Sequence, residues 1–163
     1  MTTNSITFGK GRLTIEDVVE IANGANAQLN NADEFTAKID RAVEFLERLL
    51  KEEGVIYGVT TGYGDSCTVA IPTDLVDELP LHLTRFHGCG LGENLDEQQS
   101  RAVLATRLCS LSQGVSGVTL DLLNQIVTLI NHGISPRIPQ EGSVGASGDL
   151  TPLSYLAAAL IGE

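Results

Sequence analysis

The chain has 163 residues, of which 42% are hydrophobic and 19% are charged, the composition of a globular protein. Its 21 acidic and 10 basic residues give a formal net charge of −11, which argues against a nucleic-acid-binding protein with a basic surface. The three cysteines are odd in number and widely spaced, which predicts reduced thiols in a cytoplasmic protein rather than a disulfide framework or a zinc site.

The amino-terminal segment MTTNSITFGKG lacks the basic start and apolar core of a secretory signal. The apolar runs, such as residues 155–161, are much shorter than the roughly 20 residues that a membrane-spanning helix needs. We therefore expect that no part of this chain crosses a bilayer.

The first predicted elements are a short strand with a turn over residues 5–13 and a helix from Thr14 to about Asn23. Thr14 is the expected N-cap of this helix, and Asp17 is its weaker capping-box partner. A second helix is predicted to begin at Asp33, because apolar residues then recur at three- and four-residue steps. These residues are Phe35, Ile39, Ala42, Val43, Leu46, Leu49 and Leu50, and Gly54 supplies the stop.

The helical period disappears between Gly54 and Thr73, where β-branched residues and glycines predict a strand fragment and a long loop. Residues 73–88 predict a helix that Pro80 kinks or divides in two. Two amphipathic helices are predicted next, over residues 96–113 and 119–131, because a glycine-bearing turn separates two segments of helical period.

Residues 135–148 carry two prolines and three glycines, which predict an irregular connection. A last helix is predicted from Asp149, with Pro152 tolerated in its first turn, and it is expected to run on to the end of the chain. Because its apolar surface needs partners that the chain does not obviously supply, we expect a truncated piece of a larger, mainly helical protein. Residues 1–163 show no internal boundary and are expected to form one undivided part of it.

The segment GSVGASGDLTP, residues 142–152, contains no obvious strong nucleophile or metal-ligand cluster, yet its backbone can react. Because glycine has no Cβ, the nitrogen of Gly148 can approach the carbonyl carbon of Ala146 closely. Attack would close a five-membered ring, and loss of water from the ring and from the Ser147 side chain would leave an exocyclic methylene conjugated to an imidazolone. The alternative is that Ser147 or Asp149 only caps the following helix.

The extended string GSVGASGDLTPL, residues 142–153, resembles the signature of the histidine, phenylalanine and tyrosine ammonia-lyases. In that family Ala-Ser-Gly cyclises to the prosthetic group 4-methylidene-imidazol-5-one, MIO. The resemblance therefore implies that Ala146, Ser147 and Gly148 form an MIO, and it implies no metal and no dissolved cofactor.

The resemblance also implies supporting roles and a fold. Asp149 matches the aspartate that assists ring formation, although an acidic residue at a helix N-terminus is also an ordinary partner of the helix dipole. Ser143 is implied as a supporting hydrogen-bonding residue. The implied fold is mainly α: the helical amino-terminal region of an ammonia-lyase of the fumarase/aspartase-like superfamily, with a short β segment and glycine-rich active-site loops.

A second segment, VIYGVTTGYGDS at residues 55–66, is similar to the family's loop with the catalytic tyrosine. This implies that Tyr57, as phenolate, is the base that removes the β-proton of the substrate, and it places Gly64 among the substrate-binding residues. A phenol keeps its proton at neutral pH unless positive potential or donated hydrogen bonds stabilise the anion, and converging helix N-termini would supply both. Tyr63 departs from the usual phenylalanine. The alternative for Tyr57 is an aromatic anchor of the loop.

A third segment, LTRFHGCGLGE at residues 83–93, is similar to the family's helix whose two-residue pair contacts the substrate ring, which implies Phe86 and His87. The pair is typically Ser-His, Phe-Leu or His-Leu for histidine, phenylalanine and tyrosine substrates, so Phe-His matches none of them. His87 can hydrogen-bond an imidazole or a phenol, and Phe86 favours a flat ring. We expect tyrosine as substrate ahead of histidine; the alternative for His87 is an ordinary helix residue.

The implied activity is that of an aromatic L-amino-acid ammonia-lyase, which eliminates ammonia and leaves an α,β-unsaturated acid. The family implies a homotetramer whose active sites combine several chains, with a small aromatic amino acid as its ligand. Two alternatives stay open: an MIO-dependent aminomutase, and a non-catalytic fragment that serves assembly. The family's later tyrosine, arginine and asparagine are not found in this sequence, so the 163-residue chain is expected to be inactive by itself.

Overall fold

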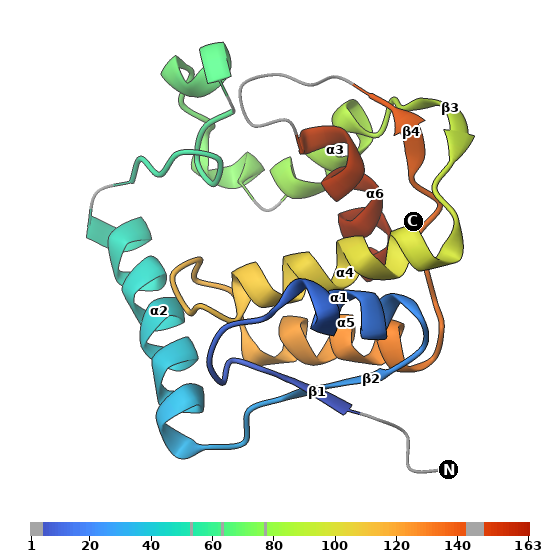
Figure 1. The fold of residues 1–163 in the computed structure, drawn as a ribbon. Coiled ribbons are helices and arrows are strands. Elements are labelled where there is room, and N and C mark those ends of the chain that lie inside the picture. Colours follow the sequence, from blue (N-terminus) through green and yellow to red (C-terminus); the bar gives the residue numbers. More distant parts are fainter. Residues whose placement is uncertain (1–4, 53, 63, 77, 143–148) are drawn as a thin grey trace. The chain divides into compact units, whose positions relative to one another are not determined.

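The computed structural model describes residues 5–52, 54–62, 64–76, 78–142 and 149–163 (Figure 1). Within these ranges helices predominate and strands are short, so the expectation of a mainly α chain is confirmed. None of the described helices is both long and apolar enough to span a membrane. The chain divides into two compact units. The first comprises Met1–Phe45 and Leu95–Arg137, and the second comprises Leu46–Asn94 and Ile138–Glu163.

The first unit begins with two short parallel strands, β1 (Ser5–Phe8) and β2 (Asn26–Leu29), joined by helix α1 (Ile15–Ala22). The predicted strand at the start of the chain is confirmed. The sequence did not predict β2, because Asn and Gln are poor strand formers. Its pairing with β1 and the Asn131 side chain, which accepts from the Ala27 N–H at 2.7 Å and donates to the Ala27 carbonyl at 2.9 Å, hold this strand in place.

The N-terminus of α1 is a capping box, as the sequence predicted. The Asp17 N–H donates to the Thr14 hydroxyl at 3.1 Å, and the Thr14 N–H donates to the Asp17 carboxylate at 2.8 Å. Two of the N–H groups that a helix start leaves without partners are therefore satisfied by residues three positions apart.

The other helices of the first unit also follow the predictions. They are the first part of α2 (Asp33–Glu52), α4 (Glu97–Leu111) and α5 (Leu120–Asn131). Helix α4 packs against α1 and α5, and α5 packs against β2 (Figure 1). The apolar core of this unit consists of Phe8, Ile21, Ala27, Phe35, Ile39, Leu104, Ala105, Leu108, Leu111, Leu123, Ile126 and Ile130.

Arg101 of α4 is a buried cation at the C-terminal ends of two helices, and only 5% of its surface is exposed. Its guanidinium donates to the carbonyls of Ile21 at 2.8 Å, Ala25 at 3.1 Å and Ile130 at 2.5 Å. The C-terminal end of a helix carries carbonyls without intrahelical partners and a partial negative charge. The Arg101 side chain therefore provides hydrogen-bond donors and a positive charge at the C-terminal ends of both α1 and α5.

Replacing Arg101 with methionine is expected to lower the free energy of unfolding by roughly 3 kcal/mol, because two buried carbonyls and one part-buried carbonyl each lose a charged donor. Urea unfolding followed by circular dichroism measures this change. Arg107→Met, at a half-buried position on the same helix, is the matched control and is expected to cost much less. Equal losses for the two variants would contradict this role of Arg101.

The second unit contains α3 (Leu79–His87) packed against α6 (Leu150–Ile161) (Figure 1). Strand β3 (Leu91–Asn94) pairs antiparallel with β4 (Pro139–Glu141), and two short 3-10 helices, η1 (Gly64–Thr68) and η2 (Thr73–Leu75), precede α3. In contrast to the first unit, most of the buried side chains among its described residues are polar. They are Thr60, Thr61, Thr151 and Ser154, with Ile138 and Leu156 as the apolar members.

Several predictions for this unit need correction. Residues 54–73 form no named strand in their described part, but only a single antiparallel bridge between Thr61 and Ala70. Residues 135–148 are not wholly irregular, because β4 pairs with β3, and pairing across a long stretch of chain leaves no local signal. Helix α6 does not run on to the end: it stops at Ile161, because Gly162 adopts a left-handed φ of 80° as its C-cap.

Pro80 divides the predicted helix over residues 73–88, which is one of the two expected outcomes. Helix α3 begins at Leu79, with Pro80 in its first turn, where a missing N–H is harmless. The proline therefore fixes where α3 begins and leaves η2 as a separate turn upstream.

Candidate active site

Tyr57 lies in a tight turn that two buried threonines hold together. The Thr60 hydroxyl accepts from the Ile56 N–H at 2.7 Å, and the Thr61 hydroxyl accepts from the Gly58 N–H at 3.1 Å. Thr60 and Thr61 are 7% and 2% exposed, so both side chains are buried and the two hydrogen bonds are part-buried. The threonine pair therefore fixes the backbone on both sides of Tyr57.

The hydroxyl oxygen of Tyr57 accepts a hydrogen bond from the Gly64 N–H at 2.9 Å. Gly64 has a left-handed φ of 57°, which glycine adopts without strain. A donated hydrogen bond stabilises negative charge that develops on a phenol oxygen. Tyr57 is 62% exposed, so it does not anchor the loop in a core in this chain, and that alternative is wrong.

Phe86 and His87 form the C-terminal end of α3 and contact each other edge to face. Their ring centroids are 5.0 Å apart and their planes meet at 80°. Phe86 is 75% exposed, so it offers an apolar ring to the surroundings rather than filling the core of this unit. The helix ends immediately afterwards, where the Gly88 N–H donates to the Thr84 carbonyl at 2.9 Å.

The predicted MIO triplet Ala146-Ser147-Gly148 and the predicted supporting residue Ser143 lie outside the described residues, but both flanks of that segment are described. A Cβ built on Gly142 would lie 2.7 Å from Cγ2 of Thr151, a residue that is 1% exposed. Only glycine permits this close approach, which brings the chain before the triplet against the first turn of α6. The segment that must bend for ring closure therefore begins and ends at neighbouring points.

Asp149 is the N-cap of α6, but its side chain makes no capping hydrogen bond and is exposed. Asp149 therefore occupies the N-cap position without capping the helix through its side chain, and the other half of that alternative, a cap by Ser147, lies outside the described residues. The N-terminal end of a helix carries N–H groups without intrahelical partners and a partial positive charge, which withdraws electrons from a group placed there. In the sequence, the triplet directly precedes this N-terminal end, and Gly142, which precedes the triplet, lies against Thr151 in the first turn of α6. The residues present therefore fit an MIO.

The structure thus brings the described candidates together in pairs, Tyr57 with Gly64 and Phe86 with His87, all within the second unit. A pocket of about 290 Å³ lies elsewhere, in the first unit, between the start of α2 and the end of α4, and none of the candidates lines it. Among the described residues, no group of three His, Cys, Asp or Glu side chains is placed to hold a metal ion.

Sequence reasoning did not single out Thr60, Thr61 or Thr151. All three lie within sequence segments that were identified as candidate motifs, residues 55–66 and 142–153. What the sequence lacked was a signal that these small polar side chains are buried and shape the backbone beside the reactive groups.

Residues 13–163 match the family model described as aromatic amino acid lyase. Histidine ammonia-lyase of Staphylococcus aureus strain JH9 is 41% identical over 151 residues, which cover 93% of this chain and 30% of that protein. Human histidine ammonia-lyase is 38% identical over 152 residues, covering 93% of this chain and 23% of that protein. The chain therefore spans less than a third of the length of these relatives.

The crystal structure of tyrosine aminomutase from Streptomyces globisporus superimposes with a TM-score of 0.88 at 36% identity, covering 98% of this chain and 30% of that one. This likeness confirms the expected fold of the ammonia-lyases and aminomutases. Because the family model matches almost the entire sequence, the chain belongs to the aromatic amino acid lyase family.

Proposed function

We propose that this chain supplies the MIO and the proton-abstracting tyrosine of an aromatic L-amino-acid ammonia-lyase. The observation that carries the proposal is the GSVGASGDLTPL signature at the N-terminal end of α6, in a chain of this family. The MIO made from Ala146-Ser147-Gly148 would supply an electrophilic alkene for the substrate amine or ring. Removal of the β-proton and contact with the substrate ring would fall to side chains of the second unit.

Tyr57 would remove the β-proton of the substrate. As phenolate, its oxygen takes the proton and becomes the neutral hydroxyl, the electrons of the broken C–H bond form the double bond, and the C–N bond breaks to release ammonia. The Gly64 N–H supports this role, since it donates to that oxygen, and the Thr60 and Thr61 contacts hold the turn. The product is an α,β-unsaturated acid.

Phe86 and His87 would contact the aromatic ring of the substrate. The exposed Phe86 ring favours a flat apolar partner, and a nitrogen of His87 can hydrogen-bond a phenol or an imidazole. We propose tyrosine as the first substrate to test and histidine as the second, since the curated relatives above are named histidine ammonia-lyases.

We also propose a cytoplasmic homotetramer in which residues 1–163 form one undivided part of the lyase domain.

An aminomutase is the second candidate, because the structure of a tyrosine aminomutase superimposes closely. An aminomutase returns ammonia to the β-carbon, so its product keeps the nitrogen. Chromatography of the products formed from ¹⁵N-labelled tyrosine and histidine separates the two activities: a labelled β-amino acid indicates the aminomutase, and free labelled ammonia with an unsaturated acid indicates the lyase.

The 163-residue chain alone is expected to show no turnover and to keep the mass that its codons dictate. A fusion of residues 1–163 to the remaining part of the Staphylococcus aureus histidine ammonia-lyase is expected to release an unsaturated acid, followed by ultraviolet absorbance with each aromatic amino acid. A fusion that folds and tetramerises yet yields neither an unsaturated acid nor a β-amino acid would contradict the proposed function. Turnover by the chain alone would contradict the need for the remainder.

A further inference from the structure

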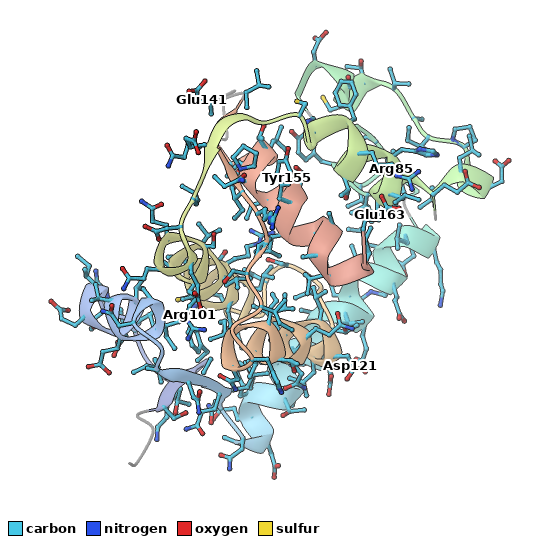
Figure 2. The ribbon with its side chains drawn as sticks, turned by 90° about the vertical axis from the view of Figure 1, so that its right-hand side faces the viewer. Arg85, Arg101, Asp121, Glu141, Tyr155 and Glu163 are labelled. Carbon is cyan, nitrogen blue, oxygen red and sulfur yellow. The ribbon has the colours of Figure 1, made fainter. Side chains whose placement is uncertain are left out.

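Arg85 and Glu163 join the end of α3 to the end of α6. The Arg85 Nε–H donates to Oε2 of Glu163 at 2.8 Å, and Nη2 contacts Oε1, so the pair is bidentate (Figure 2). The hydrogen bond to Arg85 is the main reason why the pKa of the Glu163 carboxyl lies below its ordinary value of 4.5. A lowered pKa means that the ion pair is present at neutral pH and is lost only as the pH falls below that value.

Tyr155 forms a second link between the same two regions. Tyr155 lies on α6 (Figure 2), and its hydroxyl accepts a hydrogen bond at 3.1 Å from the N–H of Gly90, which follows α3. Between the two links, α6 and the end of α3 are in ordinary van der Waals contact, since a Cβ on Gly88 would lie 3.8 Å from the Ser154 hydroxyl. Gly90 itself has no room for a side chain, because its Cβ would meet Pro139 at 2.8 Å.

These two links enclose the candidate ring-contacting pair. Arg85 immediately precedes Phe86 and His87, and Gly90 follows them by three residues. Tyr155 lies on α6 and Glu163 follows its C-cap Gly162, and this helix starts at Leu150, directly after the triplet and Asp149. The end of α3 is therefore fixed on both sides of the pair to the helix that continues from the predicted MIO.

We propose that Arg85 and Tyr155 are positioning residues, which hold the Phe86–His87 pair at a set place relative to α6 and so determine which aromatic ring is accepted. This inference rests on the proposed function. The Arg85 and Glu163 side chains are 57% and 35% exposed, and exposed ion pairs contribute little to folding. A large effect on substrate choice would therefore not arise from lost stability.

The test uses the fusion that carries residues 1–163, with tyrosine and histidine as probes. Arg85→Met is expected to lower kcat/KM by about tenfold, mainly through a higher KM, and to change the ratio of the two kcat/KM values. The reason is that the ring pair loses its place while the reacting groups remain. The charge exchange Arg85→Glu with Glu163→Arg is expected to restore kcat/KM to within about threefold, and Arg41→Met, at an exposed position on α2, is the matched control.

A second measurement does not depend on activity. In the 163-residue chain, hydrogen exchange at the Gly90 amide is expected to quicken about tenfold in Tyr155→Phe, because that amide loses its acceptor, and to stay unchanged in Arg41→Met. Unchanged Gly90 exchange in Tyr155→Phe would overturn the Tyr155 link whether or not the fusion is active. In an active fusion, an Arg85→Met variant with the kinetics of Arg41→Met would overturn the positioning role, although the proposed function would stand.

Discussion

Changing Ser147 to alanine is expected to lower turnover of the complete enzyme on the order of a thousand-fold or more. Alanine has no hydroxyl to leave, so the exocyclic methylene cannot form even if the backbone ring closes. Without the alkene there is no electrophile for the substrate, and proton removal at a β-carbon must proceed unaided. Steady-state kinetics with tyrosine and histidine, in the fusion carrying residues 1–163, measure the loss.

The control for this change is Ser110→Ala, which removes the same hydroxyl at an exposed position on α4. It is expected to leave kcat and KM essentially unchanged. Circular dichroism and the size of the assembly show whether both variants fold equally well. If Ser147→Ala retained the rate of Ser110→Ala, the triplet would have no part in the reaction, and the simpler interpretation of a helix-capping loop would regain support.

Tyr57→Phe is expected to lower kcat by roughly 10²- to 10⁴-fold, the range typical of a lost general base. Phenylalanine keeps the ring and removes only the oxygen to which the Gly64 N–H donates. The MIO does not depend on this oxygen, so the variant is expected to be lighter than its own codons dictate by the same two water molecules as the unaltered protein. A slower β-proton step also predicts a larger kinetic isotope effect with β-deuterated substrate.

Tyr63→Phe is the matched control, since it removes a phenol oxygen from the same segment and restores the residue usual in the family. Its kcat is expected to stay within about threefold of the unaltered value, because Tyr63 is assigned no role in the reaction. If Tyr57→Phe and Tyr63→Phe had the same small effect, Tyr57 would not be the base.

The elements that the sequence predicted well are those with local causes. Thr14 with Asp17 and the three- and four-residue apolar steps after Asp33 each act within one or two helical turns, so α1 and α2 could be read from neighbouring residues. Strands β2, β3 and β4 have no such signal. They exist because distant segments pair, and β2 also depends on the Asn131 side chain, more than a hundred residues away in sequence.

The candidate site shows the same division. Tyr57, Phe86 and His87 were identified by motifs, and the structure places each within the second unit. The contacts that hold them were not predictable, because the Gly64 N–H reaches Tyr57 through a left-handed turn and Arg85 reaches Glu163 across 78 positions of sequence. The candidate residues can be identified from short sequence motifs, whereas the hydrogen bonds that hold them in place depend on the tertiary structure.

The intact mass of the complete enzyme carrying residues 1–163 tests most directly whether the Ala146-Ser147-Gly148 backbone condenses into an electrophile. Mass spectrometry is expected to find the protein lighter than its codons dictate by two water molecules, with the deficit confined to the peptide that contains residues 142–153, and borohydride is expected to add to that peptide and abolish activity. A complete, folded protein with the unmodified mass and no reaction with borohydride would contradict the account.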